Sequence, residues 1–234
     1  MKRRYILGGY WGIRAESVEQ CADRLLKFFS DMSKRDELLS TWYRKGRTPA
    51  KALEKRVNVT DREQLLQELN RGRNRRDFGH EVIEELGFSV NLWNGRKADE
   101  AIGLRVTCGC FSEFVSNVVV INLPQALGSL GHSDQMIPIL AAMASAWDPE
   151  WAGVMSSEAR SARNGFGKGP FVDWIVYIPQ IVNSVPLPSI VTQVPGCGSI
   201  IAVRPTPPEN DPETLSRIHN IEQIIRATNR RSSE

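Results

Sequence analysis

The period of the hydrophobic pattern changes near position 86, and this change constrains the fold more than any other feature of the chain. Upstream, apolar residues recur at helical spacing over residues 16–33, which predicts a helix there. Its apolar face is Val18, Cys21, Leu25 and Phe29. Downstream, apolar and polar residues alternate, as in a strand with one buried face. A chain that segregates its helical and alternating segments favours an α+β fold.

Two alternating segments predict an antiparallel strand pair. Residues 88–92 and 102–108 each alternate apolar and polar side chains, and Asn94-Gly95 between them is a typical turn dipeptide. The charged segment Arg96–Glu100 is expected to form the loop of this hairpin. A continuous apolar run at residues 118–123 predicts a central strand of the same sheet.

The remaining segments complete the predicted fold. Further strands are expected at residues 5–11, near 154, at 171–178 and at 198–203. Further helices are expected at residues 38–43, from Thr48-Pro49, from a Thr60/Glu63 capping box, at 135–147 and from Asp211-Pro212. Residues 156–170 are the one long irregular region. The prediction is an α+β fold with a mostly antiparallel sheet and flanking helices, in a single domain over residues 1–229 with a frayed tail at 230–234.

Cysteine usage and hydropathy predict a cytoplasmic protein. The four cysteines are irregularly spaced and too few for a disulfide framework, so we expect free thiols: Cys21, Cys108, Cys110 and Cys197. No stretch approaches the roughly 20 apolar residues of a membrane span. The N-terminal apolar run contains three glycines and no small-residue cleavage site, unlike a signal peptide. We expect no contact with a membrane.

Charge is distributed unevenly along the chain. Residues 1–80 carry 19 Lys/Arg against 11 Asp/Glu, whereas residues 81–234 carry 11 against 16. The basic cluster Arg71–Arg76 supports an alternative hypothesis, a nucleic-acid-binding module held by phosphate contacts. Four acids follow directly and would weaken its attraction for phosphate, so nucleic acid is the less favoured partner. These acids are Asp77, Glu81, Glu84 and Glu85.

The sequence carries no complete catalytic, metal or cofactor motif. The run Gly165–Pro170 lacks the Lys-Ser/Thr end of a phosphate loop, and the Gly-x-Ser-x-Gly of α/β-hydrolases is missing. Cys108 and Cys110 share a strand face, but no second Cys or His pair has ligand spacing. Asp173 and His80 are the remaining acid–base candidates, and neither can be given a partner nucleophile or base. We therefore predict a protein that is not an enzyme and binds no cofactor or metal.

The segment Trp147-Asp148-Pro149-Glu150-Trp151 is the most suggestive binding motif. Two large aromatic residues flank two carboxylates around a turn fixed by proline. Tryptophan is frequent among binding hot spots because it buries a large area with few torsions. Trp147 also falls on the apolar face of its predicted helix, so core packing is an equal alternative for both indoles. Asp99 and Glu100, on the hairpin loop, are further acidic candidates.

Several segments together resemble the immunity protein 52 family. In chain order they are Tyr10-Trp11-Gly12 with Arg14 and Glu16-Ser17, Trp42–Gly46, Gly72–Asp77, Glu84–Phe88 leading to Leu92–Gly95, and Trp147-Asp148-Pro149 with Trp151. They occur in the order of the family, and the resemblance covers the chain from about residue 5 to 205. The ordered set is more specific than any one of these motifs.

The resemblance implies an α+β immunity protein of a bacterial polymorphic-toxin system. Such a protein neutralises, by stoichiometric binding, a nuclease toxin of the restriction-endonuclease fold that a neighbouring gene encodes and type VI secretion delivers. The net charge of +3 argues against a uniformly acidic imitation of DNA, but a local acidic patch in residues 81–234 would steer association. The resemblance implies no catalytic residue, and the oligomeric state stays open. The candidate toxin-binding residues are Trp147, Asp148, Glu150, Trp151, Asp99 and Glu100.

Overall fold

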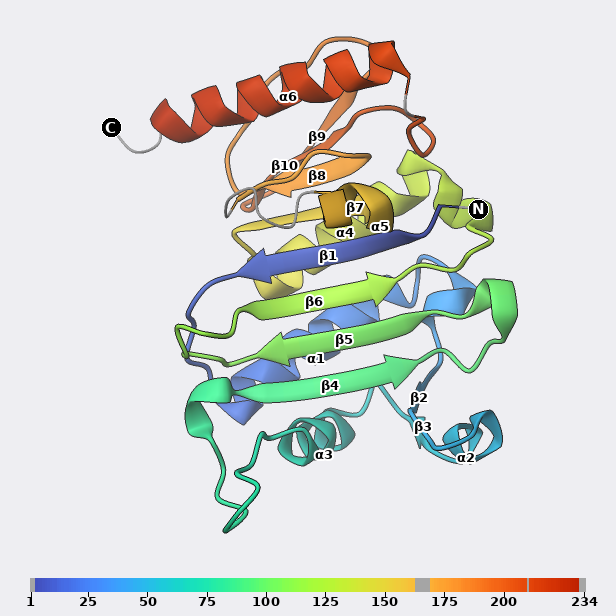
Figure 1. The fold of residues 1–234 in the computed structure, drawn as a ribbon, viewed down its shortest axis with the longest axis vertical. Coiled ribbons are helices and arrows are strands. Elements are labelled where there is room, and N and C mark those ends of the chain that lie inside the picture. The colour runs from blue at the N-terminus through green and yellow to red at the C-terminus, as the bar shows by residue number, and fades with distance from the viewer. Residues whose placement is uncertain (1–2, 163–168, 210, 232–234) are drawn as a thin grey trace.

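The computed structural model describes residues 3–162, 169–209 and 211–231, which form one ten-stranded sheet with helices on both faces (Figure 1). The strands are β1 (Tyr5–Trp11), β2 (Trp42–Arg44), β3 (Arg56–Val57), β4 (Phe88–Trp93), β5 (Gly103–Cys108), β6 (Asn117–Asn122), β7 (Trp151–Ser156), β8 (Ile175–Ile178), β9 (Ile190–Val194) and β10 (Gly198–Ala202). Their order across the sheet is β3-β2-β4-β5-β6-β1-β7-β8-β10-β9. Every neighbouring pair is antiparallel, which confirms the predicted α+β class.

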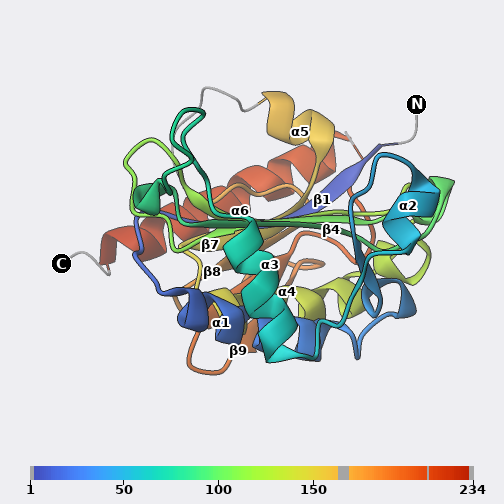
Figure 2. The ribbon, with the colours of Figure 1, turned by 90° about the horizontal axis from the view of Figure 1, so that it is seen from below.

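The helices form two layers of unequal size. They are α1 (Val18–Met32), α2 (Pro49–Leu53), α3 (Arg62–Arg71), α4 (Ser133–Trp147), α5 (Ser157–Ala162) and α6 (Pro212–Arg231), with short 3-10 turns η1 (Glu37–Leu39), η2 (Glu84–Leu86), η3 (Ala98–Glu100) and η4 (Gly128–Gly131). Helices α1, α3 and α4 cover one face of the sheet, and α5 and α6 lie on the other (Figure 2). None of the helices in the described ranges is long and apolar enough to cross a bilayer.

Burial on one or both faces explains why the strands differ in pattern. Ile175 and Val176 are neighbours on β8 but belong to apolar clusters on opposite faces, so every residue of β8 is buried. On β4, Val90 is buried against the main core while its neighbour Asn91 is exposed on the face away from α1. A continuous apolar run therefore marks a strand between two helix layers, and an alternating run marks a strand with one open face.

Most predicted elements are confirmed. The alternating segments pair as β4 and β5 with Val90 opposite Val106, and the apolar run at 118–123 becomes β6 near the middle of the sheet. Thr48 caps α2, and the Asp211 carboxylate accepts the Thr214 N–H at the start of α6. Strand β9 and helix α5 were not predicted.

The helix predicted at residues 38–43 is wrong. The chain forms η1 and then turns into β2, where Trp42 pairs with Val57 and Tyr43 with Trp93. The indole N–H of Trp42 donates to the Leu39 carbonyl at 2.9 Å, which closes the bend between the two elements. Strand pairing across the chain overrides a short helical spacing, because intrinsic propensity is a weak determinant over so few residues.

Three predicted boundaries shift. Asp61, not Thr60, caps α3: its carboxylate accepts the N–H groups of Glu63 and Gln64, whereas the Thr60 hydroxyl donates to Asn58. Helix α4 begins at Ser133 and contains Pro138. Helix α6 continues to Arg231, so only residues 232–234 of the predicted tail, with positions 165–168 of the glycine-rich run, lie outside the described residues.

Candidate protein-binding surface

Three segments from distant parts of the chain meet at one end of the sheet, where β1 ends and β7 begins. They are residues 12–14 after β1, the β5–β6 connection at 109–116, and the α4–β7 turn at 148–150. Glu150 Oε1 accepts the Gly12 N–H at 3.0 Å, and the Arg14 N–H donates to the Cys110 carbonyl at 3.0 Å. These bonds hold the three segments side by side.

Three cations satisfy the C-terminus of α4 and fix the turn that follows. Lys27 Nζ donates to the Ser145 carbonyl at 2.7 Å, and Arg24 donates to that of Ala146 at 2.8 Å. The two terminal nitrogens of Arg14 donate to the Trp147 and Asp148 carbonyls at 2.6 Å each. The last carbonyls of a helix have no partner within it and carry partial negative charge, so cations are favoured there. The position of Asp148 is therefore fixed by its backbone.

Asn117 holds the β5–β6 connection in place. Its side chain is fully buried; its oxygen accepts the Cys110 N–H at 2.9 Å, and its nitrogen donates to the carbonyls of Gly12 at 2.6 Å and Cys110 at 2.9 Å. A buried amide with three partners fixes the relative position of the two segments, because unpaired buried polar groups are unfavourable. Asn117 therefore anchors the β5–β6 connection to the residues that follow β1.

Apolar side chains project from this frame into solvent. Ile13 is 61% exposed and Phe114 is 93% exposed, with Phe111 and Val115 also exposed beside them in sequence. The same three segments carry exposed carboxylates: Glu113 on the β5–β6 connection, and Asp148 and Glu150 on the α4–β7 turn. We call this set the strand-end surface; its members are Ile13, Phe111, Glu113, Phe114, Val115, Asp148 and Glu150. An apolar centre with a polar rim is the usual composition of a protein interface.

Sequence reasoning missed the apolar members of this surface. A signal was present, since two phenylalanines stand three residues apart in a short connection that follows an alternating strand. Large apolar residues in a loop outside the strand pattern are candidates for binding, because the core does not require them there. Their proximity to the α4–β7 turn, however, depends on the order of the strands.

Trp147 and Trp151 lie on opposite faces of the sheet. Trp147 is fully buried, with its ring centroid 5.5 Å from that of Trp11, so it packs in the core, the alternative that the sequence left open, and it is not a member of the strand-end surface. Trp151 is half-buried and stacks on Tyr10 with 4.4 Å between centroids. Asp148 adopts a left-handed conformation with φ of 46° at the end of α4, and this turn leads the chain into β7, an interior strand of the sheet.

Asp99 and Glu100 are exposed at the opposite end of the strands from Asp148 and Glu150. They form η3 in the β4–β5 hairpin, where the Asp99 carbonyl accepts the Ala126 N–H at 3.0 Å. Gly103, just after η3, pairs with Asn122, whereas Tyr10 beside the other site pairs with Trp151. The structure therefore divides the acidic candidates into two separate sites.

The basic cluster Arg71–Arg76 does not form a continuous positive surface. Arg73 lies 3.8 Å from Glu84, and Arg76 lies 3.9 Å from Glu81. The expected local pairing with acids is present, and it opposes the attraction for phosphate on which nucleic-acid binding depends.

Other candidate chemistry has structural explanations. Asp173 is buried and accepts the Ser156 N–H at 2.6 Å. Burial raises the pKa of its carboxyl above the ordinary value, and the hydrogen bond from Ser156 offsets only part of this rise. All four cysteines are free thiols. Within the described part of the chain, no group of three or more His, Cys, Asp or Glu residues could hold a metal ion.

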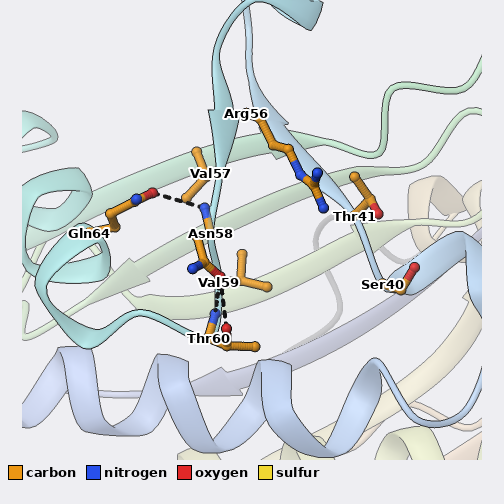
Figure 3. Close-up of a pocket in the computed structure, with 8 residues that line it drawn as sticks. All are labelled: Ser40, Thr41, Arg56, Val57, Asn58, Val59, Thr60 and Gln64. Carbon is orange, nitrogen blue, oxygen red and sulfur yellow. Dashed lines mark hydrogen bonds between the residues drawn. The ribbon is translucent and has the colours of Figure 1, made fainter.

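A pocket of about 520 Å³ lies on the protein surface beside β3 (Figure 3). Its polar residues are largely engaged with one another: Gln64 accepts the Asn58 N–H at 2.9 Å, and the Thr60 hydroxyl donates to Asn58 at 2.7 Å. Arg56 is its one charged residue. The pocket contains no acid–base pair or nucleophile–base pair, so it has the features of a surface crevice.

Replacing Arg14 with alanine is expected to lower the free energy of unfolding by about 2 kcal/mol, because it removes two charge-assisted hydrogen bonds at a partly exposed helix terminus. It also removes the guanidinium that lies 5.4 Å from the centre of the Trp11 ring. Arg14→Lys, which restores charge without the two-pronged geometry, should recover part of the loss. Urea denaturation measures the free energy of unfolding of both variants. If Arg14→Ala were as stable as the wild type, these hydrogen bonds would not contribute to the stability of the fold.

The fold and the strand-end surface define an antiparallel α+β protein with a rigid, carboxylate-rimmed apolar patch suited to binding another protein. The family model for immunity protein 52 matches residues 3–215. The chain belongs to the immunity protein 52 family, as the motifs in its sequence indicated. Among solved structures, T6SS protein PA0821 of Pseudomonas aeruginosa is similar, with a TM-score of 0.55 and 11% identity over 97% of this chain and 76% of that chain. No curated protein matches the chain.

Proposed function

We propose that the chain is a cytoplasmic immunity protein that binds a cognate toxin stoichiometrically and neutralises it through the strand-end surface. The observation that carries this proposal is the exposure of Ile13, Phe111 and Phe114 on loops fixed by Asn117 and Arg14. A surface that is rigid before binding loses little conformational entropy in the complex, which favours high affinity. Family membership supports the immunity role.

The proposed partner is a nuclease of the restriction-endonuclease fold, encoded by a neighbouring gene. A nuclease presents a basic face to its substrate, and the carboxylates of Glu113, Asp148 and Glu150 complement such a face. Because this acidic rim is local, the overall charge of +3 does not oppose it. The similarity to a T6SS protein supports delivery of the toxin by type VI secretion.

The acidic rim is expected to accelerate association more than it strengthens the final complex. The double variant Asp148→Ala plus Glu150→Ala should lower the association rate of the purified toxin about tenfold at low salt, with a smaller loss at high salt. Surface plasmon resonance over a salt series measures the rate. Glu150 also bonds to Gly12, so circular dichroism must first show an unchanged fold.

The pair Asp99→Ala plus Glu100→Ala is the matched control, because it removes the same charge at the other end of the strands. Wild-type association by this control, with slower association by the Asp148/Glu150 variant, supports the strand-end surface. The reverse result would move the site to η3. Failure of the wild-type chain to bind the neighbouring toxin, or to protect cells from it, would refute the proposed function itself.

A further inference from the structure

A second projecting feature lies at the same end of the strands as the strand-end surface. We call residues Arg73–Ile83 the hairpin arm. Its two sides are tied by the Arg76 N–H to the Glu81 carbonyl and the Ile83 N–H to the Asn74 carbonyl, at 2.9 Å each. The arm lies between α3 and η2 in the chain. It extends away from the sheet at the lower left of Figure 1 (Figure 1, Figure 2).

The tip of the arm is a short loop, residues 77–80, between Arg76 and Glu81, whose backbones are hydrogen-bonded to each other. Gly79 and His80 have left-handed backbone conformations, with φ of 80° and 54°. The left-handed conformation at His80 is unfavourable for a residue with a side chain, so the surrounding hairpin must hold it. The arm is thus an ordered projection.

Nothing in the described fold requires the side chain at this tip. Phe78 is 93% exposed, and Arg75 and Arg76 beside it are also exposed. Only the base of the arm packs against the domain: the Arg73 guanidinium lies 5.3 Å from the centre of the Phe88 ring, which belongs to β4. A fully solvated aromatic side chain on an ordered projection is typical of an anchor for a partner.

We infer that the hairpin arm is a second toxin contact, which places Phe78 in a concave apolar site on the toxin whose rim carries carboxylates facing Arg75 and Arg76. The inference rests on the proposed function. The base of the arm is followed by η2, and η2 contacts the strand-end surface, since the Phe111 N–H donates to the Glu85 carbonyl at 3.0 Å. One partner can therefore contact both the hairpin arm and the strand-end surface. The arm presents arginines to this partner, and the strand-end surface presents carboxylates.

The charge pattern favours a protein over nucleic acid as the partner of the arm. Asp77 and Glu81 lie on the same arm as the arginines, and the Arg76 guanidinium lies 3.9 Å from the Glu81 carboxylate. Phosphate binding is driven by uncompensated positive charge, which these acids reduce. A protein site with an apolar floor and a polar rim accommodates charges of both signs.

The test compares Phe78→Ser with Leu187→Ser in the full chain. Leu187 is 90% exposed on the loop before β9, far along the sheet from the arm, so it controls for loss of an exposed apolar residue. Calorimetry with the purified toxin of the neighbouring gene is expected to show about a thirtyfold loss of affinity for Phe78→Ser and none for Leu187→Ser. Trypsin cleavage after Arg75 and Arg76 should be fast in the free chain and slow in the complex.

The outcomes separate this inference from the proposed function. If Phe78→Ser binds like the wild type, and trypsin still cleaves at Arg75 and Arg76 in the complex, the arm is not a contact although the chain still binds its toxin. If the wild-type chain does not bind the toxin, the proposed function fails as well. Salt-sensitive binding of duplex DNA that Phe78→Ser abolishes, with toxin affinity unchanged, would assign the arm to nucleic acid and overturn the inference.

Discussion

Replacing Trp147 with alanine is expected to lower the free energy of unfolding by about 3–5 kcal/mol, because it empties a large site in the main core. Its indole is fully buried, 5.5 Å from the Trp11 ring and 6.4 Å from that of Phe28. Helices α1 and α4 and the sheet hold this cluster between them, so the cavity cannot close without moving secondary structure. Chemical denaturation measures the loss, and thermal melting should show a fall of about 10 °C.

Trp151→Ala is the control, since it removes the same side chain from the same five-residue segment. Trp151 is half-buried and stacks on Tyr10 on the other face, so the expected loss is about 1 kcal/mol. Trp147→Phe retains most of the ring volume and removes an indole N–H for which the described residues supply no partner, so it should cost less than Trp147→Ala. Equal losses for Trp147→Ala and Trp151→Ala would contradict the assignment of Trp147 to the core.

The alternating and continuous apolar segments allowed β4, β5 and β6 to be predicted. A strand buried on one face alternates apolar and polar residues, and a strand buried on both faces is apolar throughout. The separation of Trp147 from Trp151 could not be predicted in the same way. It depends on the left-handed turn at Asp148, which the Arg14 guanidinium stabilises from 134 residues away. A local pattern reports which residues are apolar, but not which side of the sheet each one reaches after a turn.

The candidate site was predictable only in part, for a topological reason. The α4–β7 turn was recognised from its own residues, whereas Ile13 and Phe114 gain meaning only when β1, β5, β6 and β7 lie side by side. The separation of Asp99 and Glu100 from Asp148 follows from the strand connections, which no local pattern reports. The β4–β5 loop and the β5–β6 connection lie at opposite ends of β5, so one compact surface cannot include both.

The double variant Phe111→Asp plus Phe114→Asp is expected to lower toxin affinity by roughly a thousandfold, about 4 kcal/mol. Phe114 is 93% exposed and Phe111 is 43% exposed in the free protein, so the free energy of unfolding should fall by only about 1 kcal/mol, mainly through Phe111. In the proposed complex they fill the centre of the contact, where aspartate would bury unpaired charge. Calorimetry measures the affinity, and cells that express the toxin with this variant should lose protection.

The kinetics of this variant distinguish an apolar anchor from the acidic rim. Loss of central apolar contacts should act mainly on dissociation and depend little on salt, whereas loss of Asp148 and Glu150 should act on association and depend strongly on it. Leu215→Asp on α6 is the control, because Leu215 is likewise exposed and lies on another element. If Phe111→Asp plus Phe114→Asp changed only the association rate, or if Leu215→Asp weakened binding equally, the strand-end surface would not be the anchor of the complex.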